Sequence, residues 1–281
     1  MNFGEVLDRF EAEFLPERRL KPKSLKDTQQ MLRRIRRELG ERGIEGLRVA
    51  DIAAFLDELA PRSSNRHRAL LNQVFRFAIS KGVTEKNLVE HTMARPTPKR
   101  RKRLTEEQFW KIHHHARPEI QRAMELGLVS LQRRHDLVAA KWSSIRDGVW
   151  YVDQEKTGTS LGIRCDARLN ELLRRSNIIS GSKFILHYGQ DSRRKLIGQP
   201  LKPEALTRGF RAALVSSGLS DAKDAKNDPS FHEIRSLGAE LYRKAGWPED
   251  RIQALLGHRD AAMTRKYLEG HEREVPIVEL N

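Results

Sequence analysis

The residue types in this chain that could do chemistry gather near its C-terminal end. His232 and Arg235 stand three residues apart in a helical pattern, so they point the same way on a helix of 3.6 residues per turn. The apolar positions fall on the opposite side, which predicts that both cations face away from the core. His258 follows in a Leu-Leu-Gly-His turn, and Tyr267 comes nine residues later. Arginine, histidine and tyrosine without carboxylates suit a phosphodiester and are ill suited to a metal.

The composition points to a polyanionic partner. The 281 residues include 53 Lys and Arg against 38 Asp and Glu, a net charge of +15, which favours nucleic acid.

No window approaches the roughly 20 apolar residues of a membrane span, and the acidic, amphipathic N-terminus is not a signal peptide. The single cysteine, Cys165, excludes an internal disulfide and fits a reducing compartment. We therefore expect a cytoplasmic protein without a membrane partner.

The first 93 residues predict a small helical bundle. Apolar spacing gives a first helix over residues 3–14. A capping box of Ser24 and Asp27 opens a second helix that ends near Gly40. Ser63 or Ser64 caps a later helix that stops at Gly82. A helix over residues 52–59 and a short one after Thr84 complete the unit.

A basic segment follows the bundle. Residues 94–103, ARPTPKRRKR, contain two prolines that prevent regular structure. Six of the nine positions from 95 to 103 are cationic. Such a run stays extended unless an anion neutralises it. We interpret it as a strap on DNA that joins two domains. Its predicted DNA-binding residues are Arg95, Lys99, Arg100, Arg101, Lys102 and Arg103.

A second, mostly helical domain begins at Leu104. Helices are expected after the capping box of Thr105, over residues 120–131, 168–175 and 203–217, and from His232. The β-prone stretches 149–152 and 160–165 predict an antiparallel hairpin that carries Lys156 at its tip or edge. Short strands are expected near 184–186 and in the tail sequence VPIVEL, residues 275–280. The fold class is mainly α with one small antiparallel sheet.

These motifs together resemble those of tyrosine recombinases, most closely lambda-type phage integrases. The family pattern is R-x-x-[ED]-L-x-x-x-x-W, a lysine on a β-hairpin, H-x-x-R, Gly-His, and a tyrosine about nine residues after that histidine. The corresponding residues in this chain are Arg133 with Asp136, Lys156, His232 with Arg235, His258 and Tyr267. The N-terminal bundle resembles the SAM-like core-binding domain of the same family.

The resemblance implies three parts: a core-binding domain over residues 1–93, a linker over 94–103 and a catalytic domain over 104–281. Two departures stand out. Asp136 replaces the glutamate of most members, and the sequence starts at the core-binding domain without the small arm-type domain of lambda-type integrases, so the resemblance gives no basis for predicting arm-site regulation. Base-reading residues are expected on the segments 22–40, 62–82 and 203–211.

The resemblance also implies a role for each site residue. Arg133 and Arg235 hold the phosphate, and His258 donates a further hydrogen bond to it. Tyr267 is the nucleophile, Lys156 the general acid, and His232 either the proton acceptor or a transition-state donor. Asp136 is expected to hold Arg133 in place. Neither a metal nor another cofactor is expected, because fixed cations meet the developing charge.

The implied function is site-specific DNA recombination, as in viral genome integration, in a bacterial cell or phage-infected host. Double-stranded DNA is the partner, and recombination implies a homotetramer on two duplexes. The VPIVEL strand is predicted to dock on a neighbouring protomer, and DNA-bending or directionality proteins are further candidate partners. Two alternatives remain open: a type IB topoisomerase, which uses the same residues as a monomer, and a DNA-binding regulator without catalysis.

Overall fold

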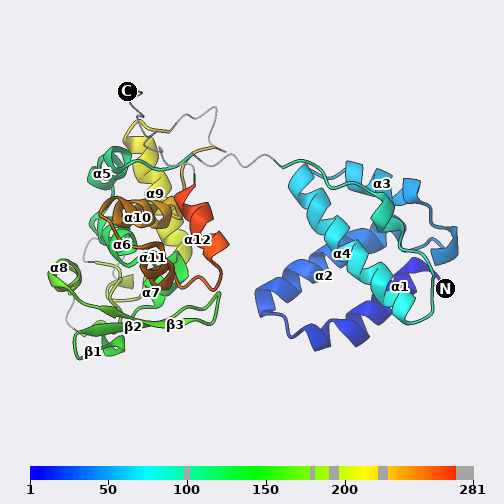
Figure 1. Ribbon diagram of the computed structural model, residues 1–281, viewed down its shortest axis with the longest axis horizontal. Coiled ribbons are helices and arrows are strands. Elements are labelled where there is room, and N and C mark those ends of the chain that lie inside the picture. The colour runs from blue at the N-terminus through cyan, green and yellow to red at the C-terminus, as the bar shows by residue number, and fades with distance from the viewer. Residues whose placement is uncertain (98–101, 178–180, 190–195, 221–226, 270–281) are drawn as a thin grey trace, which may run out of the picture. The chain divides into compact units, whose positions relative to one another are not determined.

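The computed structural model describes residues 1–97, 102–177, 181–189, 196–220 and 227–269 (Figure 1). The chain divides into two compact units, residues 1–99 and 100–281, and each has its own apolar core. None of the described helices is both long enough and apolar enough to cross a membrane. The tail sequence VPIVEL lies outside the described residues.

The first unit is helical throughout. Its main helices are α1 (Phe3–Arg9), which continues into a π-helical turn η1 (Phe10–Phe14), α2 (Pro22–Leu39), α3 (Val49–Asp57) and α4 (Pro61–Ser80), with short 3₁₀ turns at Pro16–Arg18, Ile44–Gly46 and Leu88–His91. The prediction of serine caps for α2 and α4 is wrong. Both helices begin at a proline, whose missing N–H costs nothing in the first turn and whose fixed φ suits a helix.

The apolar stripe of α2 explains how the first unit presents its charge. Leu32, Ile35 and Leu39 are buried, so the helix packs through this side. Arg33 and Arg37 are left exposed on the other side. The exposed side of α2 therefore carries arginines.

The second unit packs helices against one small sheet. Its helices are α5 (Glu106–His114), α6 (Pro118–Ser130), α7 (Arg134–Ala139), α8 (Ala167–Ser176), α9 (Pro203–Ser216), α10 (Glu233–Lys244), α11 (Glu249–Leu256) and α12 (Ala261–Leu268), with a 3₁₀ turn η5 at Trp142–Ser144. The sheet is antiparallel in the order β1 (Ile145–Arg146), β2 (Val149–Asp153), β3 (Ser160–Arg164). In the predicted hairpin, Trp150 faces Ile163 and Asp153 faces Ser160.

One strand prediction needs correction, and one strand was not predicted. The unpredicted strand β1 has only two residues and so shows almost no alternation in the sequence. The segment 184–186 is not a strand, because Phe184 forms only an isolated bridge with Lys141. Ile185 and Leu186 are buried and lie in a bend.

Helix α10 runs through the middle of the second unit, where it contacts α6, α11 and α12 (Figure 1). All residues from Glu233 to Glu240 are buried. Gly238 permits this enclosure, since a Cβ there would lie 2.3 Å from the carbonyl oxygen of Leu128 on α6. The first turn of α10 is thus fixed from several sides, which makes it a rigid base for the site.

Candidate active site

The candidate site is built on the first turn of α10. His232 is the N-cap residue and is exposed, whereas Arg235 is only 2% exposed. The Arg235 guanidinium donates to the main-chain carbonyls of Leu131 and Leu256, and its Nη2 lies 3.3 Å from His258 Nε2. The prediction that Arg235 faces away from the core is therefore wrong, because α11 and α12 pack on that side of the helix.

The turn between α11 and α12 brings His258 to Arg235. Gly257 ends α11 in the left-handed conformation, with φ 60°. It also leaves room for a buried side chain, since a Cβ at position 257 would lie 2.6 Å from Gln154. His258 follows, buried, with Nδ1 at 3.1 Å from the Thr264 hydroxyl on α12. Contacts with Arg235 at Nε2 and with Thr264 at Nδ1 fix the orientation of the imidazole.

Tyr267 lies in the last turn of α12 with its hydroxyl directed at the start of α10. Its Oη is 2.8 Å from His232 Nε2. Its ring centroid is 4.9 Å from that of His258 and 5.5 Å from the guanidinium carbon of Arg235. The phenol hydroxyl therefore has an imidazole nitrogen within hydrogen-bond distance, the geometry that a proton transfer between the two groups requires.

A buried carboxamide connects Arg133 to this centre. Arg133 Nη1 donates to Gln154 Oε1 at 2.5 Å, and Gln154 is 1% exposed. The Gln154 amide donates in turn to the Leu256 carbonyl at 3.1 Å and to Gln132 Oε1 at 2.8 Å. Gln154 therefore links Arg133 to the chain just before His258.

Gln154 belongs to none of the sequence motifs above, although the strand pattern contains a signal for it. Trp150 and Val152 point into the core from β2, and the strand period of two places Gln154 on the same side. A polar side chain at an inward position needs hydrogen-bond partners. Continuing the alternation past the end of the strand would have singled out this residue.

Lys156 and Asp136 lie around the hairpin turn that follows Gln154. Lys156 is exposed on the turn between β2 and β3. Asp136 is buried, and its Oδ1 accepts a hydrogen bond from the main-chain N–H of Glu155 at 3.2 Å. Within the described residues its carboxylate makes no hydrogen bond to Arg133. Gln154 therefore contacts Arg133 where Asp136 is predicted to do so, and Asp136 instead anchors the turn that carries Lys156.

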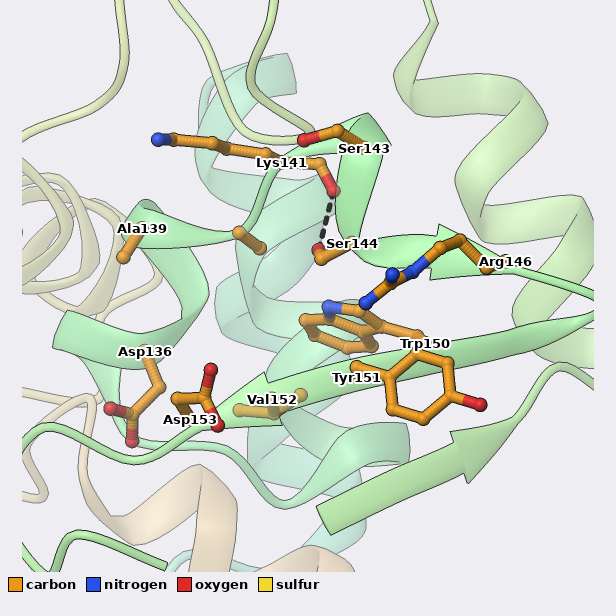
Figure 2. A pocket seen from close by; sticks show the side chains of 11 residues that line it. Asp136, Ala139, Lys141, Ser143, Ser144, Arg146, Trp150, Tyr151, Val152 and Asp153 are labelled. Atoms are coloured by element: carbon orange, nitrogen blue, oxygen red, sulfur yellow. Dashed lines mark hydrogen bonds between the residues drawn. The ribbon is translucent and has the colours of Figure 1, made fainter. Parts of the chain in front are cut away.

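Asp136 also lines a separate pocket of about 300 Å³ (Figure 2). Figure 2 shows this pocket between side chains of β2 and the segment that leads from α7 to β1, with Trp150 and Arg146 among its lining residues. Of the described site residues, only Asp136 lines it. The pocket therefore lies beside the cluster of cations and is not part of it.

Burial affects the charge states of Arg235 and His258 differently. Burial and the nearby Arg133 lower the pKa of Arg235 to about 10, so the guanidinium stays charged at neutral pH. Burial, together with Arg235 and Arg133, lowers the pKa of His258 to about 4. Its imidazole is therefore neutral at pH 7. Because Arg235 can only donate, His258 Nε2 accepts and Nδ1–H donates to Thr264. A bound phosphate would offset the repulsion among these groups.

The low pKa of His258 predicts a pH-dependent stability. The unfolded imidazole takes up a proton below about pH 6.5, while the folded one stays neutral down to about pH 4. The unfolding free energy should therefore fall as the pH drops through this window and then level off. The full effect is about 3 kcal/mol. Urea unfolding of the wild type and His258→Asn at pH 7 and pH 4.5 checks this: the variant should lose less stability, and equal losses would contradict the assignment.

The described arginines at the two ends of the basic linker are used inside their own units. Arg95 Nη1 donates to the Leu59 carbonyl at 2.7 Å, and its main chain pairs with the Asn65 side chain. The Arg103 side chain is 11% exposed and contacts α10 and α12. Lys102 is exposed. Lys99, Arg100 and Arg101 lie outside the described residues, so their contact with DNA stays a prediction.

The comparisons with known proteins cover both units. Residues 102–274 match the model of the phage integrase family, and residues 7–82 match its N-terminal SAM-like domain. The chain is 35% identical to the integrase of Escherichia phage lambda over 98% of its length and 78% of that protein. It is 33% identical to the integrase of Escherichia phage HK022 over the same shares of the two chains.

Solved structures give the same result. The lambda integrase fragment 75–356 bound to DNA superposes with a TM-score of 0.83 at 33% identity, and the match covers 100% of both chains. A lambda integrase tetramer bound to a Holliday junction gives a TM-score of 0.85 over 99% of this chain and 80% of that chain, at 33% identity. These matches span the helical bundle, the small sheet and the cluster around Tyr267.

A SAM-like helical domain followed by this helical domain with one small sheet defines the class of site-specific tyrosine recombinases. The chain belongs to the phage integrase family.

Proposed function

We propose that this chain breaks and rejoins duplex DNA at specific sites through a covalent bond to Tyr267. The observation that carries the proposal is the 2.8 Å contact between the Tyr267 hydroxyl and His232 Nε2 beside the buried Arg235. Tyr267 Oη attacks the phosphorus of the scissile phosphodiester, and the bond from phosphorus to the deoxyribose 5′ oxygen breaks. The products are a 3′-phosphotyrosyl link and a free 5′-hydroxyl.

Arginines meet the charge that develops in this step. As phosphorus becomes five-coordinate, negative charge grows on its non-bridging oxygens, and preorganised donors lower the barrier. Arg133 and Arg235 suit this role because a guanidinium fork matches two phosphate oxygens and stays protonated. Both are held in advance, Arg133 by Gln154 and Arg235 by two main-chain carbonyls. His258 joins them once an arriving phosphate favours a proton on its Nε2.

Two protons move in the cleavage step. The contact between the Tyr267 hydroxyl and His232 supports His232 as the acceptor of the phenolic proton. The leaving 5′ oxygen needs a proton in return, and we assign this donation to Lys156 on the hairpin turn. The phosphotyrosyl bond conserves the phosphodiester energy, so rejoining needs neither ATP nor a metal. Strand exchange follows when a 5′-hydroxyl of another duplex attacks the link.

The first unit offers a surface for the duplex. A groove of about 590 Å³ lies between α2 and α4, and its lining includes Arg33, Arg34, Arg37 and Arg66. Backbone phosphates supply most of the salt-dependent affinity of such surfaces. The groove falls on two of the three segments that the sequence predicts to read bases, and Lys99, Arg100 and Arg101 would extend the contact.

We also propose a tetramer on two duplexes, acting in the cytoplasm of a bacterial host. The solved lambda integrase tetramer on a Holliday junction supports it, because exchange needs four active sites. Residues 275–280 would dock on a neighbouring protomer. Deleting residues 271–281 should alter the multimers formed on DNA; unchanged tetramers with unchanged cleavage would rule out this docking.

Covalent capture of DNA tests the proposed function. The protein is mixed with nicked half-site DNA from the host replicon, or with a random-site library, in EDTA, and the products are run on a denaturing gel. A slowly migrating, protease-sensitive DNA band is expected. Joining of the captured strand to a new duplex distinguishes a recombinase from a topoisomerase. DNA binding without any covalent band would favour a regulator that does not cleave.

The Gln154 network gives a prediction about cleavage rate. Gln154→Ala removes the acceptor of Arg133 and leaves the buried Gln132 oxygen without its donor, whereas the Leu256 carbonyl loses one donor and keeps Arg235 as the other. We expect the single-turnover rate of adduct formation to fall about 10- to 100-fold and the unfolding free energy to fall by about 2 kcal/mol. Rates at saturating protein and urea unfolding curves measure the two effects.

Thr157→Val is the matched control. Thr157 donates to the same Gln154 oxygen at 2.9 Å but does not touch Arg133 among the contacts described. Its loss should change the rate by less than about threefold. Equal rate losses in both variants would mean that the hairpin as a whole, rather than the hold on Arg133, limits cleavage.

A further inference from the structure

Arg103, the last residue of the basic linker, makes an unusually dense set of contacts inside the second unit. On α10, its Nη1 donates to Ser236 Oγ at 2.6 Å and to Glu233 Oε2 at 3.2 Å. On α12, its Nη2 donates to the Lys266 carbonyl at 2.6 Å, and its Nε donates to the Glu269 carbonyl at 2.8 Å. All three guanidinium nitrogens are therefore engaged with protein groups.

These contacts surround the main chain of Tyr267. Arg103 holds the carbonyl of the residue before the tyrosine and that of the second residue after it. The tyrosine carbonyl itself accepts from Ser236 Oγ at 2.5 Å, and that hydroxyl also accepts from Arg103. The last carbonyls of a helix have no partner within the helix, and a cation there is favoured by the helix dipole. Arg103 supplies both the donors and the charge.

Helix α12 needs such a hold. It has eight residues, and Thr264 is its one fully buried side chain. A helix this short has little stability of its own. Its last turn carries the hydroxyl that must meet a phosphorus atom, and a displacement of about 1 Å can cost about 100-fold in rate.

We propose that Arg103 is a positioning residue for the Tyr267 nucleophile and does not serve as a DNA phosphate contact. The last residue of the linker thereby holds the main-chain carbonyls on either side of Tyr267. This inference rests on the proposed function, since it assigns a residue to the same cleavage step.

Arg103→Gln tests the assignment, because the cleavage rate and the affinity for DNA can be measured separately in this variant. We expect the single-turnover rate of adduct formation at saturating protein to fall about 10- to 100-fold, with a dissociation constant for DNA within about twofold and an unchanged salt dependence. Arg100→Gln, in the predicted DNA-contacting run, should weaken binding and reduce the slope of log K against log salt by about one. The same reduction for Arg103→Gln, with a normal rate at saturation, would overturn the proposal.

The rate of rejoining distinguishes a positioning role from a general structural defect, because a structural defect would slow both cleavage and rejoining. In the covalent adduct, the bond to DNA already places Tyr267. Attack of an added 5′-hydroxyl strand on isolated adduct should therefore proceed at close to the wild-type rate in Arg103→Gln, while cleavage is slow. Equal slowing of both directions would assign Arg103 to general stability and overturn its positioning role.

Ser236→Ala keeps the test informative if Arg103→Gln folds poorly. It removes the donor to the Tyr267 carbonyl, so cleavage should slow by a smaller factor, again without slowing of rejoining. Combined with Arg103→Gln, the two losses should be less than additive, because both act through one network. A wild-type adduct together with normal cleavage in both variants would contradict this inference alone. Absence of adduct with the wild type would instead count against the proposed function.

Discussion

Tyr267→Phe should abolish covalent capture of DNA while DNA binding stays within about threefold of the wild type. The substitution removes only the hydroxyl. Its hydrogen-bond partner, His232, is exposed, so no buried group is left without a partner. The ring, which packs near His258 and Arg235, is kept. Loss of one such hydrogen bond costs about 1 kcal/mol or less, so the fold should persist. A denaturing gel reports capture, and a binding titration reports affinity.

Tyr242→Phe is the matched control for this prediction. Tyr242 lies on α10 in the same unit, and its hydroxyl donates to the Val129 carbonyl at 2.7 Å. The variant loses a comparable hydrogen bond away from the cationic cluster and should capture DNA normally. Capture that survives in Tyr267→Phe would show that another group is the nucleophile, and loss of capture in both variants would indicate a defect in packing.

Much of this arrangement could be predicted because it depends on local patterns. The capping box at Thr105, the hairpin around Lys156 and the helix after His232 each follow from a few neighbouring residues. The order of Arg133, Lys156, His232, Arg235, His258 and Tyr267 matches one family pattern. The corresponding segments all belong to the second unit, which is what that pattern requires.

The remainder depends on packing between distant segments, which local patterns do not contain. Arg235 looks exposed on a helical wheel, yet α11 and α12 cover it. Arg103 looks like one more charge in a basic run, yet its partners lie at least 130 positions away along the chain. Asp136 matches the family pattern next to Arg133, but the fold turns it towards the hairpin. Proline starts for α2 and α4 were missed because serine caps compete at the same places.

Arg235→Gln should reduce the rate of adduct formation at least about 1,000-fold. Loss of a single preorganised donor to a developing oxyanion costs about 100- to 1,000-fold, and this change removes a charge as well. A glutamine amide can still donate to one of the two carbonyls that Arg235 holds. Single-turnover rates with saturating protein measure the effect, and Tyr267→Phe marks the background.

The stability of the same variant should change little, because two effects oppose each other. One carbonyl loses its donor, at a cost of about 1–3 kcal/mol. Against this, the wild type buries a cation that has no carboxylate within ion-pair distance among the described residues, and burying a charge costs several kcal/mol. We expect the thermal midpoint to shift by only a few degrees, or about 1 kcal/mol. A large fall in the midpoint would mean that Arg235 mainly holds α6 and α11 together. An unchanged midpoint with lost cleavage would mean that the chain accepts a destabilising buried charge in order to bind phosphate.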